Sequence, residues 1–584
     1  MTAVRPFVDT SLVESVAKRK YYQKGEDWEK LSLRVASYVA SVESVDENRQ
    51  YWTQEFYSLI SKKIFLPGGR ILANAGTNIT NLSNCYVYEL EDSRTAIYQG
   101  LASIAEIHAQ GGGVGINFSK LREEGAHIKS TGGESSGPVS FMDLFDVSSD
   151  VIKQASRRGA MLAALNSDHP DIFKFINAKL KESKLNNFNI SVLIQDSIMK
   201  AFENDEYVGL CSINGNECES VKASEILTAI AEAAWKSGEP GILFIGNMET
   251  RNPNPHLGEI VGTNPCGEIP GRNGASCILG SFDLKKFLFR EEGLYVLDFA
   301  ALALAVSMAV KFLDNVVDLT KSGIDLFDNI NTEDRKIGLG VMGWADVLAL
   351  MGMPYDSEEA RQYAEETAKV IYIAARKASQ ILAREKGTYP GYDETKSIDP
   401  ITLQLMFPQR NSNLLALAPT GTIHLISEVN ESIEPFYMLA YKKNFRFGKD
   451  HTENSSIIAS VTFKEVIMDN FEEDIAWEIL KNTAETGTLN PSPEFSDKIN
   501  TRIYELQACF KTAYEISPEA HVLMQAAWQK YIDLSVSKTI NLPKDATVED
   551  ILGVIYLAWK VGLKGMAIYR DGSRDEQIME KPGE

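Results

Sequence analysis

A thiol, an amide and a carboxylate lie within one short loop of the chain, Thr263-Asn264-Pro265-Cys266-Gly267-Glu268. Proline and glycine on either side of the thiol disfavour a regular helix, so these residues predict a tight turn that pushes Cys266 into a cleft. A reactive sulfur there would have an acid or base two residues away. The same residues are equally compatible with a buried cysteine in an ordinary turn, because a free cysteine often packs as a small apolar side chain.

Two further stretches carry residues suited to binding anions. Arg157 and Arg158 are adjacent in a predicted loop, and paired arginines suit phosphate or base recognition, although a solvated basic loop would look the same. The segment 419–423 places two hydroxyls and a glycine directly after the apolar run 411–417, which predicts a strand followed by a phosphate-binding turn or an ordinary helix cap. A Walker motif is excluded, because no P-loop lysine is present.

The glycine cluster at 111–117 lacks the spacing of a dinucleotide-binding fingerprint. It offers closely approaching backbone, either to a ligand or to another strand.

The cysteines contain no C-x-x-C pair and no zinc-binding spacing, so no metal site is expected. In a reducing compartment structural disulfides are not expected, and any bridge should be catalytic. Cys211, Cys218 and Cys509 are interpreted as structural residues.

Composition sets the broad class of the protein. With 584 residues, 44% apolar and 24% charged, the chain is typical of a soluble globular protein of three or four domains, or of one large barrel with added segments. A formal net charge of -21 argues against general nucleic-acid binding. No uninterrupted apolar run reaches the roughly 18 residues of a membrane span, and no signal peptide begins the chain, so we expect no membrane association and a cytoplasmic location.

Hydrophobic periodicity predicts the elements that must position these residues. Helical and strand-like patterns alternate, which indicates an α/β architecture, possibly closed. The predicted helices cover residues 1–62, 223–235, 296–318 and 356–386. Predicted strands begin at Cys85 and cover 241–245, and the glycine-punctuated segment 336–343 is predicted as a strand or a turn.

Several separated motifs occur together in the order found in ribonucleotide reductase catalytic subunits, and the chain resembles that family from about residue 60 to residue 574. The motifs are SNCYV (83–87), QASRRGAMLAAL (154–165), TNPCGEIP (263–270), ASC (275–277), NSNLLALAPTGTIHLISE (411–428) and SVSKTIN (535–541).

The resemblance implies a ten-stranded α/β barrel made from two antiparallel five-strand halves, with a central finger loop that carries Cys266 at its tip. The expected domains are an N-terminal helical segment (1–62), the barrel (63–574) and a short C-terminal tail (575–584).

The resemblance also implies roles in radical reduction of a ribose. Cys266 would become a thiyl radical that abstracts the 3′-hydrogen, Glu268 would be the general base for the 3′-hydroxyl, and Asn264 would orient the ribose hydroxyls. Cys85 and Cys277 would deliver two electrons and become a disulfide, which requires their Cα atoms to lie within about 7 Å.

By the same resemblance, substrate and effector sites are expected around the barrel. The substrate would be a ribonucleoside di- or triphosphate, and the effector a deoxynucleotide or ATP at the interface of a homodimer. The substrate-binding residues would be Gly69, Asn84, Gly113, Pro265, Gly267, Pro419, Thr420, Gly421, Thr422 and Ile423. The effector-binding residues would be Asp92, Arg122, Lys153, Gln154 and Arg158.

The source of the radical is predicted from the C-terminal motif. Relatives that use a metal-containing subunit carry two adjacent tyrosines there, whereas this chain has only Tyr569, in YRDGSR. This favours adenosylcobalamin as cofactor, with a metal-subunit-dependent enzyme and a non-catalytic nucleotide-binding relative as alternatives. No ATP-cone precedes the barrel motifs, so ATP/dATP on/off control there is not expected. The tail lacks a cysteine pair, so a thioredoxin-like protein, another external thiol or a separate chain would re-reduce the disulfide, unless the sequence is truncated.

Overall fold

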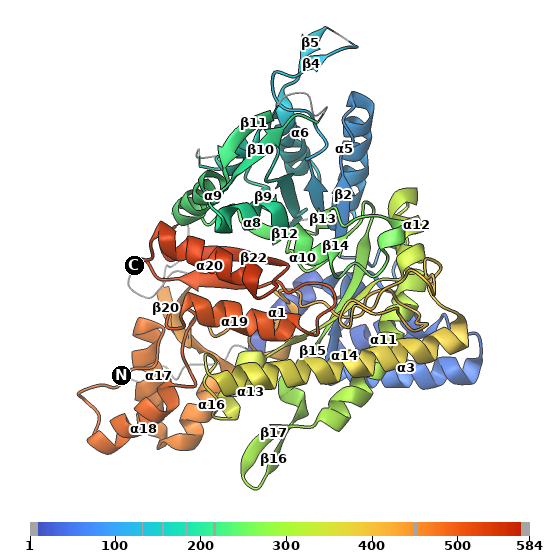
Figure 1. Ribbon diagram of the computed structural model, residues 1–584. Helices are drawn as coiled ribbons and strands as arrows, with labels where there is room; N and C mark the ends of the chain where they lie inside the picture. The colour runs from blue at the N-terminus through green and yellow to red at the C-terminus, as the bar shows by residue number, and fades with distance from the viewer. Residues whose placement is uncertain are drawn as a thin grey trace.

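A ten-stranded sheet runs through the centre of the described chain (Figure 1). The computed structural model describes residues 10–130, 132–154, 157–180, 185–213, 218–447 and 452–573. The strands of the sheet are β1 (Phe65–Pro67), β2 (Cys85–Glu89), β3 (Gly113–Asn117), β8 (Met161–Asn166), β9 (Phe188–Ile194), β12 (Gly241–Phe244), β15 (Ser276–Asp283), β18 (Ile337–Met342), β21 (Thr539–Leu542) and β22 (Gly565–Arg570).

The first half of the sheet contains five parallel strands, β2, β3, β8, β9 and β12, in sequence order. Parallel strands need crossover connections, and these connections place helices outside the sheet (Figure 1). Both faces of β8 and β9 are therefore almost entirely buried. The helices of this half are α5 (Arg94–Ala109), α6 (Gly137–Val151), α7 (Ile172–Ile176), α8 (Asp196–Glu203) and α9 (Ala223–Ser237).

The second half runs antiparallel to the first. β15 is parallel to β18, and β21 to β22, while the β15–β2 and β12–β22 pairs that join the halves are antiparallel. β1 adds to β15 in the antiparallel sense. The helices of this half are α11 (Phe299–Leu319), α12 (Asp325–Asp334), α13 (Trp344–Leu350), α14 (Glu358–Lys386), α19 (Pro518–Gln529) and α20 (Val548–Lys560).

Isolated backbone bridges close the ring into a barrel. Leu339 of β18 pairs with Leu415, and Leu417 pairs with Val536, which leads into β21. The apolar run 411–417 was predicted as a strand, and this prediction is wrong in detail, because the run forms only these single bridges. The ten-stranded α/β barrel of two antiparallel halves is confirmed.

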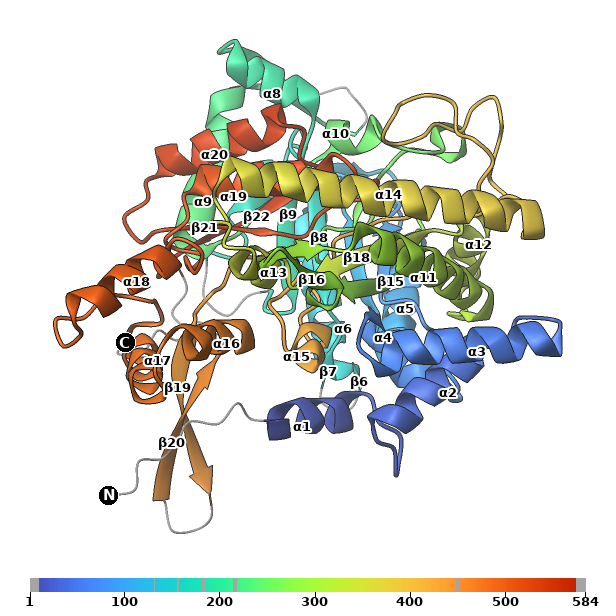
Figure 2. The same cartoon turned by 90° about the horizontal axis from the view of Figure 1, so that it is seen from below.

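Three helices precede the barrel and pack against its second half. They are α1 (Thr10–Lys20), α2 (Trp28–Ala40) and α3 (Asp46–Ser61). Asp27 caps α2 by accepting a hydrogen bond from the Lys30 backbone N–H at 2.9 Å. α2 and α3 pack on each other and on α11, and α1 lies beside α15 (Ile423–Ser427) (Figure 2).

α11 has the length and hydropathy of a membrane span, and is the single helix in the described part of the chain that does. It lies in the core of the second half, where 67% of its most apolar window is buried. Charged residues within it make internal ion pairs, such as that between Asp314 and Arg335 at 2.7 Å. Its apolar character is thus explained by packing between the strands β15 and β18 and the neighbouring helices.

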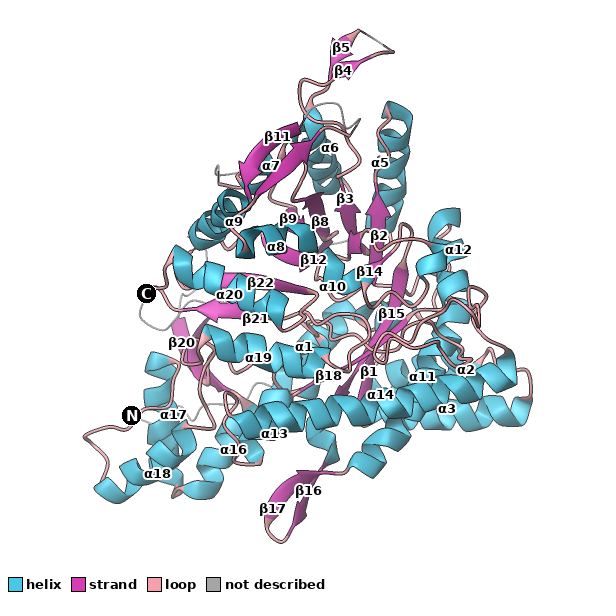
Figure 3. Cartoon of the chain, viewed as in Figure 1, coloured by secondary structure: helices cyan, strands magenta, loops and turns pink. Residues whose placement is uncertain are grey.

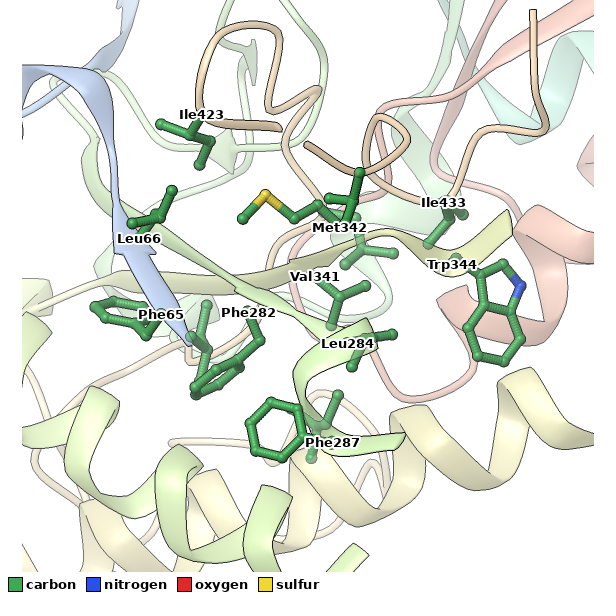
Figure 4. Packing of buried hydrophobic residues seen from close by; sticks show 14 of the residues in the cluster. Phe65, Leu66, Phe282, Leu284, Phe287, Val341, Met342, Trp344, Ile423 and Ile433 are labelled. Carbon is green, nitrogen blue, oxygen red and sulfur yellow. The ribbon is translucent and has the colours of Figure 1, made fainter. Parts of the chain in front are cut away.

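One apolar cluster ties the segment 423–433 to the barrel. In Figure 4, Ile423 and Ile433 lie with side chains from β1, β15 and β18, among them Leu66 and Val341. All of these side chains are buried. The loop that precedes Ile423 is therefore held against the strands.

Short hairpins project from the surface, as β4–β5 and β16–β17 do in Figure 3. Within the β10–β11 hairpin, Cys211 and Cys218 form a disulfide. The prediction that structural disulfides are absent is therefore wrong: the antiparallel register places these two cysteines directly opposite each other.

The hairpin strands are β4 (His127–Ile128), β5 (Gly133–Glu134), β6 (Lys153–Gln154), β7 (Arg157–Arg158), β10 (Tyr207–Cys211), β11 (Cys218–Lys222), β16 (Leu288–Glu291), β17 (Leu294–Leu297), β19 (Ala440–Phe447) and β20 (Thr452–Ala459). The remaining helices are α4 (Gly69–Asn74), α10 (Ile245–Glu249), α16 (Val461–Asn470), α17 (Glu473–Thr486), α18 (Asp497–Gln507) and the 3-10 turns Pro255–Leu257 and Leu284–Phe287.

Candidate active site

A two-stranded hairpin carries the thiol-containing loop into the barrel. β13 (Gly262–Thr263) and β14 (Pro270–Gly271) pair antiparallel, and residues 264–269 between them form the finger loop. The hairpin crosses β3 so closely that a Cβ on Gly115 would lie 1.7 Å from the Thr263 carbonyl oxygen. Only glycine permits this approach. The predicted close backbone contact at the glycine cluster is therefore made to the finger loop.

Both halves of the barrel hold the finger loop. On the first half, a Cβ at Gly113 would lie 3.2 Å from the Pro265 ring. On the second, the Ser535 backbone N–H donates to the Glu268 carbonyl at 3.0 Å, and the buried Lys336 ammonium donates to the Pro270 carbonyl at 3.1 Å. The loop is fixed at both ends.

A tight turn places Cys266 at the tip of this loop. The Gly267 backbone N–H donates to the Asn264 carbonyl at 3.1 Å, and Gly267 has φ of 84°, in the left-handed region that favours glycine. Cys266 is exposed and lines a cavity, whereas Asn264 and Glu268 are buried. The alternative of a buried structural cysteine is therefore excluded.

Asn264 is fixed by contacts at both ends of its amide. Its Oδ1 accepts a hydrogen bond from the Ile269 backbone N–H at 2.9 Å, and its Nδ2 donates to Cys85 Sγ at 3.1 Å. The amide therefore links the finger loop to Cys85, which is the first residue of β2 and one of the two predicted redox cysteines.

Glu268 is a buried carboxylate next to a thiol. Burial raises the pKa of Glu268 to about 7, while hydrogen bonds from Asn264, from the backbone and from Cys85 act in the opposite direction. Cys85 Sγ lies 3.8 Å from Glu268 Oε1, and Glu268 Oε2 has no hydrogen-bond partner among the described residues. The carboxyl group can thus exchange a proton near neutral pH and has one oxygen available for a ligand.

Cys85 and Cys277 face each other across the joint between the two halves. They are register partners in the antiparallel β2–β15 pair, where Cα atoms lie roughly 4.5 to 5.5 Å apart. This meets the separation required for a disulfide. Neither residue is disulfide-bonded in the structure, and burial raises the pKa of both thiols.

The predicted substrate loop 419–423 lies at the start of α15. Thr420 has φ of 58°, and its Oγ1 accepts a hydrogen bond from the Ser432 backbone N–H at 2.9 Å. Asn84 lies beside α4, where its Oδ1 accepts from the Arg70 backbone N–H at 3.2 Å, next to Gly69. The predicted substrate residues thus come from α4, the residue before β2, the first residue of β3, the finger loop and the start of α15.

Of the predicted effector residues, Asp92 and Arg122 are brought together in an ion pair with an N–O distance of 2.6 Å. Both side chains are partly exposed. Lys153 and Gln154 lie on β6, and Arg158 lies on β7, which pairs with β6. Their side chains fall outside the described part of the structure.

A cavity of about 620 Å³ opens onto Cys266, and its wall includes residues that the sequence analysis missed. Lys538 is buried in that wall and donates hydrogen bonds to Glu434 and to Nδ1 of the buried His521. The signal available for Lys538 was a lysine amid the strand-forming residues of SVSKTIN. The missed lining residues include Glu239, His424, Glu431, Glu434, Tyr437 and Lys538.

Comparisons with known proteins agree with this arrangement. The family described as "Ribonucleotide reductase, barrel domain" matches residues 83–569, and "Ribonucleotide reductase, all-alpha domain" matches residues 9–80. An alpha subunit of a class Id ribonucleotide reductase from Actinobacillus ureae has the same fold, with a TM-score of 0.76 at 21% identity over 97% of this chain and 98% of that one.

Two relatives are named vitamin B12-dependent ribonucleoside-diphosphate reductases. The protein from Thermoplasma acidophilum is 39% identical over 91% of this chain, which spans 66% of that protein's length. The protein from Mycobacterium tuberculosis is 36% identical over 99% of this chain and 82% of its own length. With the matched barrel and the fingertip thiol, these similarities show that the chain belongs to the ribonucleotide reductase catalytic-subunit family.

Proposed function

We propose that this chain reduces ribonucleotides to 2′-deoxyribonucleotides through a thiyl radical on Cys266. The observation that carries the proposal is the position of Cys266 at an exposed fingertip, with Glu268 and the facing Cys85 and Cys277 thiols in the buried region behind it. A ribose bound there would meet a hydrogen-abstracting group, a base and a two-electron reductant together.

Adenosylcobalamin is the proposed radical source, and the names of the two relatives support this choice. A cavity of about 620 Å³ lies in the range of small-molecule and cofactor sites, and Cys266 forms part of its wall. The wall from β12 and β22 that would face the cofactor combines the small residues Gly241, Gly565 and Ala567 with larger ones, namely Leu243, Met566, Ile568 and Tyr569. When bound, adenosylcobalamin supplies a carbon-centred radical by homolysis of its cobalt–carbon bond.

The residues of the chain divide the chemistry among them. The Cys266 thiyl takes the hydrogen atom from C3′ and becomes a thiol, while Glu268 accepts the 3′-hydroxyl proton. The 2′-hydroxyl then leaves as water with a proton from one thiol of the Cys85–Cys277 pair, and the hydrogen of the other thiol goes to C2′. The two sulfurs join as a disulfide and so supply two electrons, Glu268 returns its proton to the 3′-oxygen, and Cys266 returns a hydrogen atom to C3′, which restores the thiyl. The sum is ribonucleotide plus two thiols to deoxyribonucleotide, water and one disulfide.

Substrate and control sites complete the proposal. A ribonucleoside di- or triphosphate would place its phosphates at Thr420 to Thr422, and a deoxynucleoside triphosphate or ATP would bind near Asp92 and Arg122 in a homodimer. A thioredoxin-like protein or another external thiol would reduce the Cys85–Cys277 disulfide, in the cytoplasm.

A single-turnover experiment tests the proposed redox pair. The pre-reduced chain, incubated with adenosylcobalamin and a ribonucleotide but no reductant, should make about one deoxynucleotide per chain from this pair. Peptide mapping should then find Cys85 linked to Cys277, and a Cys277→Ser variant should form no such link. The Cys211–Cys218 disulfide is an internal control, because its state should not follow product formation. Continued turnover by Cys277→Ser with a small dithiol would refute the assignment.

A further inference from the structure

The proposed phosphate-binding loop contains no positively charged residue. Residues 419–423 are Pro, Thr, Gly, Thr and Ile, which offer hydroxyls and backbone N–H groups. A carboxylate lies close by, since a Cβ on Gly421 would be 3.4 Å from Glu431 Oε1. Burial, with the nearby Glu434 carboxylate as a smaller cause, raises the pKa of Glu431 to about 7, which lessens its repulsion of an anion without supplying attraction. A nucleoside diphosphate needs a positive group from elsewhere in the fold.

The N-terminal helix α1 supplies a positive group that contacts this loop. Lys20 is the last residue of α1, and its Nζ donates a hydrogen bond to Thr422 Oγ1 at 3.3 Å. The two residues are far apart in the sequence, and the contact exists because α1 packs against α15 (Figure 2). Lys63, which also reaches this segment, donates to the Ile426 carbonyl at 2.7 Å instead.

The backbone beside Lys20 is anchored, although the Lys20 side chain itself is exposed. Tyr21 is buried with 5% of its surface accessible, and its hydroxyl lies 3.2 Å from the Cβ position of Gly69, at the start of α4. Gln23 Nε2 donates to the Ala73 carbonyl at 3.0 Å, and the Arg34 guanidinium donates both to the Tyr21 carbonyl at 3.4 Å and to the Leu72 carbonyl at 3.1 Å. These contacts fix the end of α1 between two segments that carry proposed substrate residues, Gly69 and Thr422.

We infer that Lys20 binds the terminal phosphate of the substrate, so that the end of α1 forms a wall of the substrate site. The inference rests on the proposed function and names a specificity residue for it. An ammonium beside the Thr422 hydroxyl donates to a phosphate oxygen and balances the nearby Glu431. The helical segment before the barrel thereby contributes directly to recognition of the diphosphate.

Calorimetric titration tests this inference. The affinities of CDP and CMP for the full-length chain are measured with one deoxynucleoside triphosphate held at saturation. Lys20→Met should weaken CDP binding about tenfold, the lower range for a hydrogen bond to a charged group, and should raise KM for CDP with little change in kcat. CMP lacks the terminal phosphate, so its affinity should change little. Lys20→Arg should retain most of the CDP affinity.

Lys18→Met is the matched control, because Lys18 is exposed in the same last turn of α1 and the substitution removes the same charge. It should bind CDP as the unmodified chain does. Equal losses in Lys20→Met and Lys18→Met, or no loss in either, would overturn the role of Lys20 alone. An unmodified chain that binds no ribonucleotide would overturn the proposed function and this inference with it. Unfolding midpoints of all variants should agree, because both lysines are exposed.

Discussion

At the fingertip, the properties of Glu268 follow from where its carboxyl group is held. The side chain is buried between the finger loop and Cys85, and one of its oxygens has no partner among the described residues. A carboxylate out of water holds its proton more tightly, which is why the pKa of Glu268 rises to about 7. A base with this pKa is matched to proton transfer near neutral pH.

Glu268→Gln should separate activity from stability. The variant loses the proposed base, so turnover should fall by roughly 10² to 10⁴-fold. In the folded chain the pKa of Glu268 lies above that of an ordinary glutamate. Between about pH 4.5 and 7 the unfolded chain has therefore released this proton while the folded chain still holds it. The contribution of Glu268 to stability consequently falls as pH rises through this range. At pH 8 Glu268→Gln should therefore unfold with a free energy higher by about 3 kcal/mol, and this gain should shrink on acidification.

Chemical unfolding at pH 8 and pH 5, together with the pH profile of kcat/KM, provides the measurement. In the unmodified chain kcat/KM should rise with pH to a plateau above about pH 7 as Glu268 ionises. A stability difference that does not depend on pH, or an unchanged turnover number, would contradict the assignment of a buried base.

Much of the candidate active site could be predicted at this scale. Cys266, Glu268, Asn264, Cys85 and Cys277 lie in short motifs with distinctive residues, and the structure brings them together. Lys20 could not be found this way, because a single lysine in a polar helix carries no local signal, and for Lys538 the sequence offered only its place among the strand-forming residues of SVSKTIN. Their contacts exist only because distant segments pack together.

At the scale of elements, the finger loop depends on how closely its hairpin crosses β3. The approach of the Thr263 carbonyl to Gly115 leaves no space for a side chain, and Asn117 Nδ2 fixes the base of the hairpin by donating to the Val261 carbonyl at 2.7 Å. Strand and finger loop are thus positioned as one unit.

Gly115→Ala should displace the fingertip. The added Cβ would lie 1.7 Å from the Thr263 carbonyl oxygen, so the hairpin must move, and a shift of about 1 Å at the reacting thiol costs on the order of 10²-fold in turnover. Gly262→Ala is the control, because a Cβ on Gly262 in the same hairpin meets no atom within 4 Å. Steady-state kinetics should show a large loss only for Gly115→Ala, and equal activity of the two variants would contradict the close crossing.

The errors in element prediction have physical causes. The run 411–417 is apolar because it fills the ring between β18 and the segment before β21, but its pairing is limited to single bridges. A disulfide between Cys211 and Cys218 was not expected, because structural disulfides are rare in a reducing compartment. The register of the β10–β11 hairpin nevertheless places the two cysteines opposite each other. Neither result follows from local composition.

At the scale of the whole molecule, the barrel places the candidate catalytic residues where its two halves meet. The thiol pair lies across the β2–β15 joint, and the cavity that opens onto Cys266 is lined from β9, β12 and β22, across the other joint. The order of α/β elements predicted this architecture only in outline. Closure of the ring required the long-range register between the halves.

The most direct test of the account is product formation by the purified chain with CDP, a deoxynucleoside triphosphate and a dithiol, with and without adenosylcobalamin. We predict dCDP only when adenosylcobalamin is present, and none from Cys266→Ser, which should still bind CDP. No product with adenosylcobalamin, but product on addition of a metal-containing radical subunit, would contradict the account.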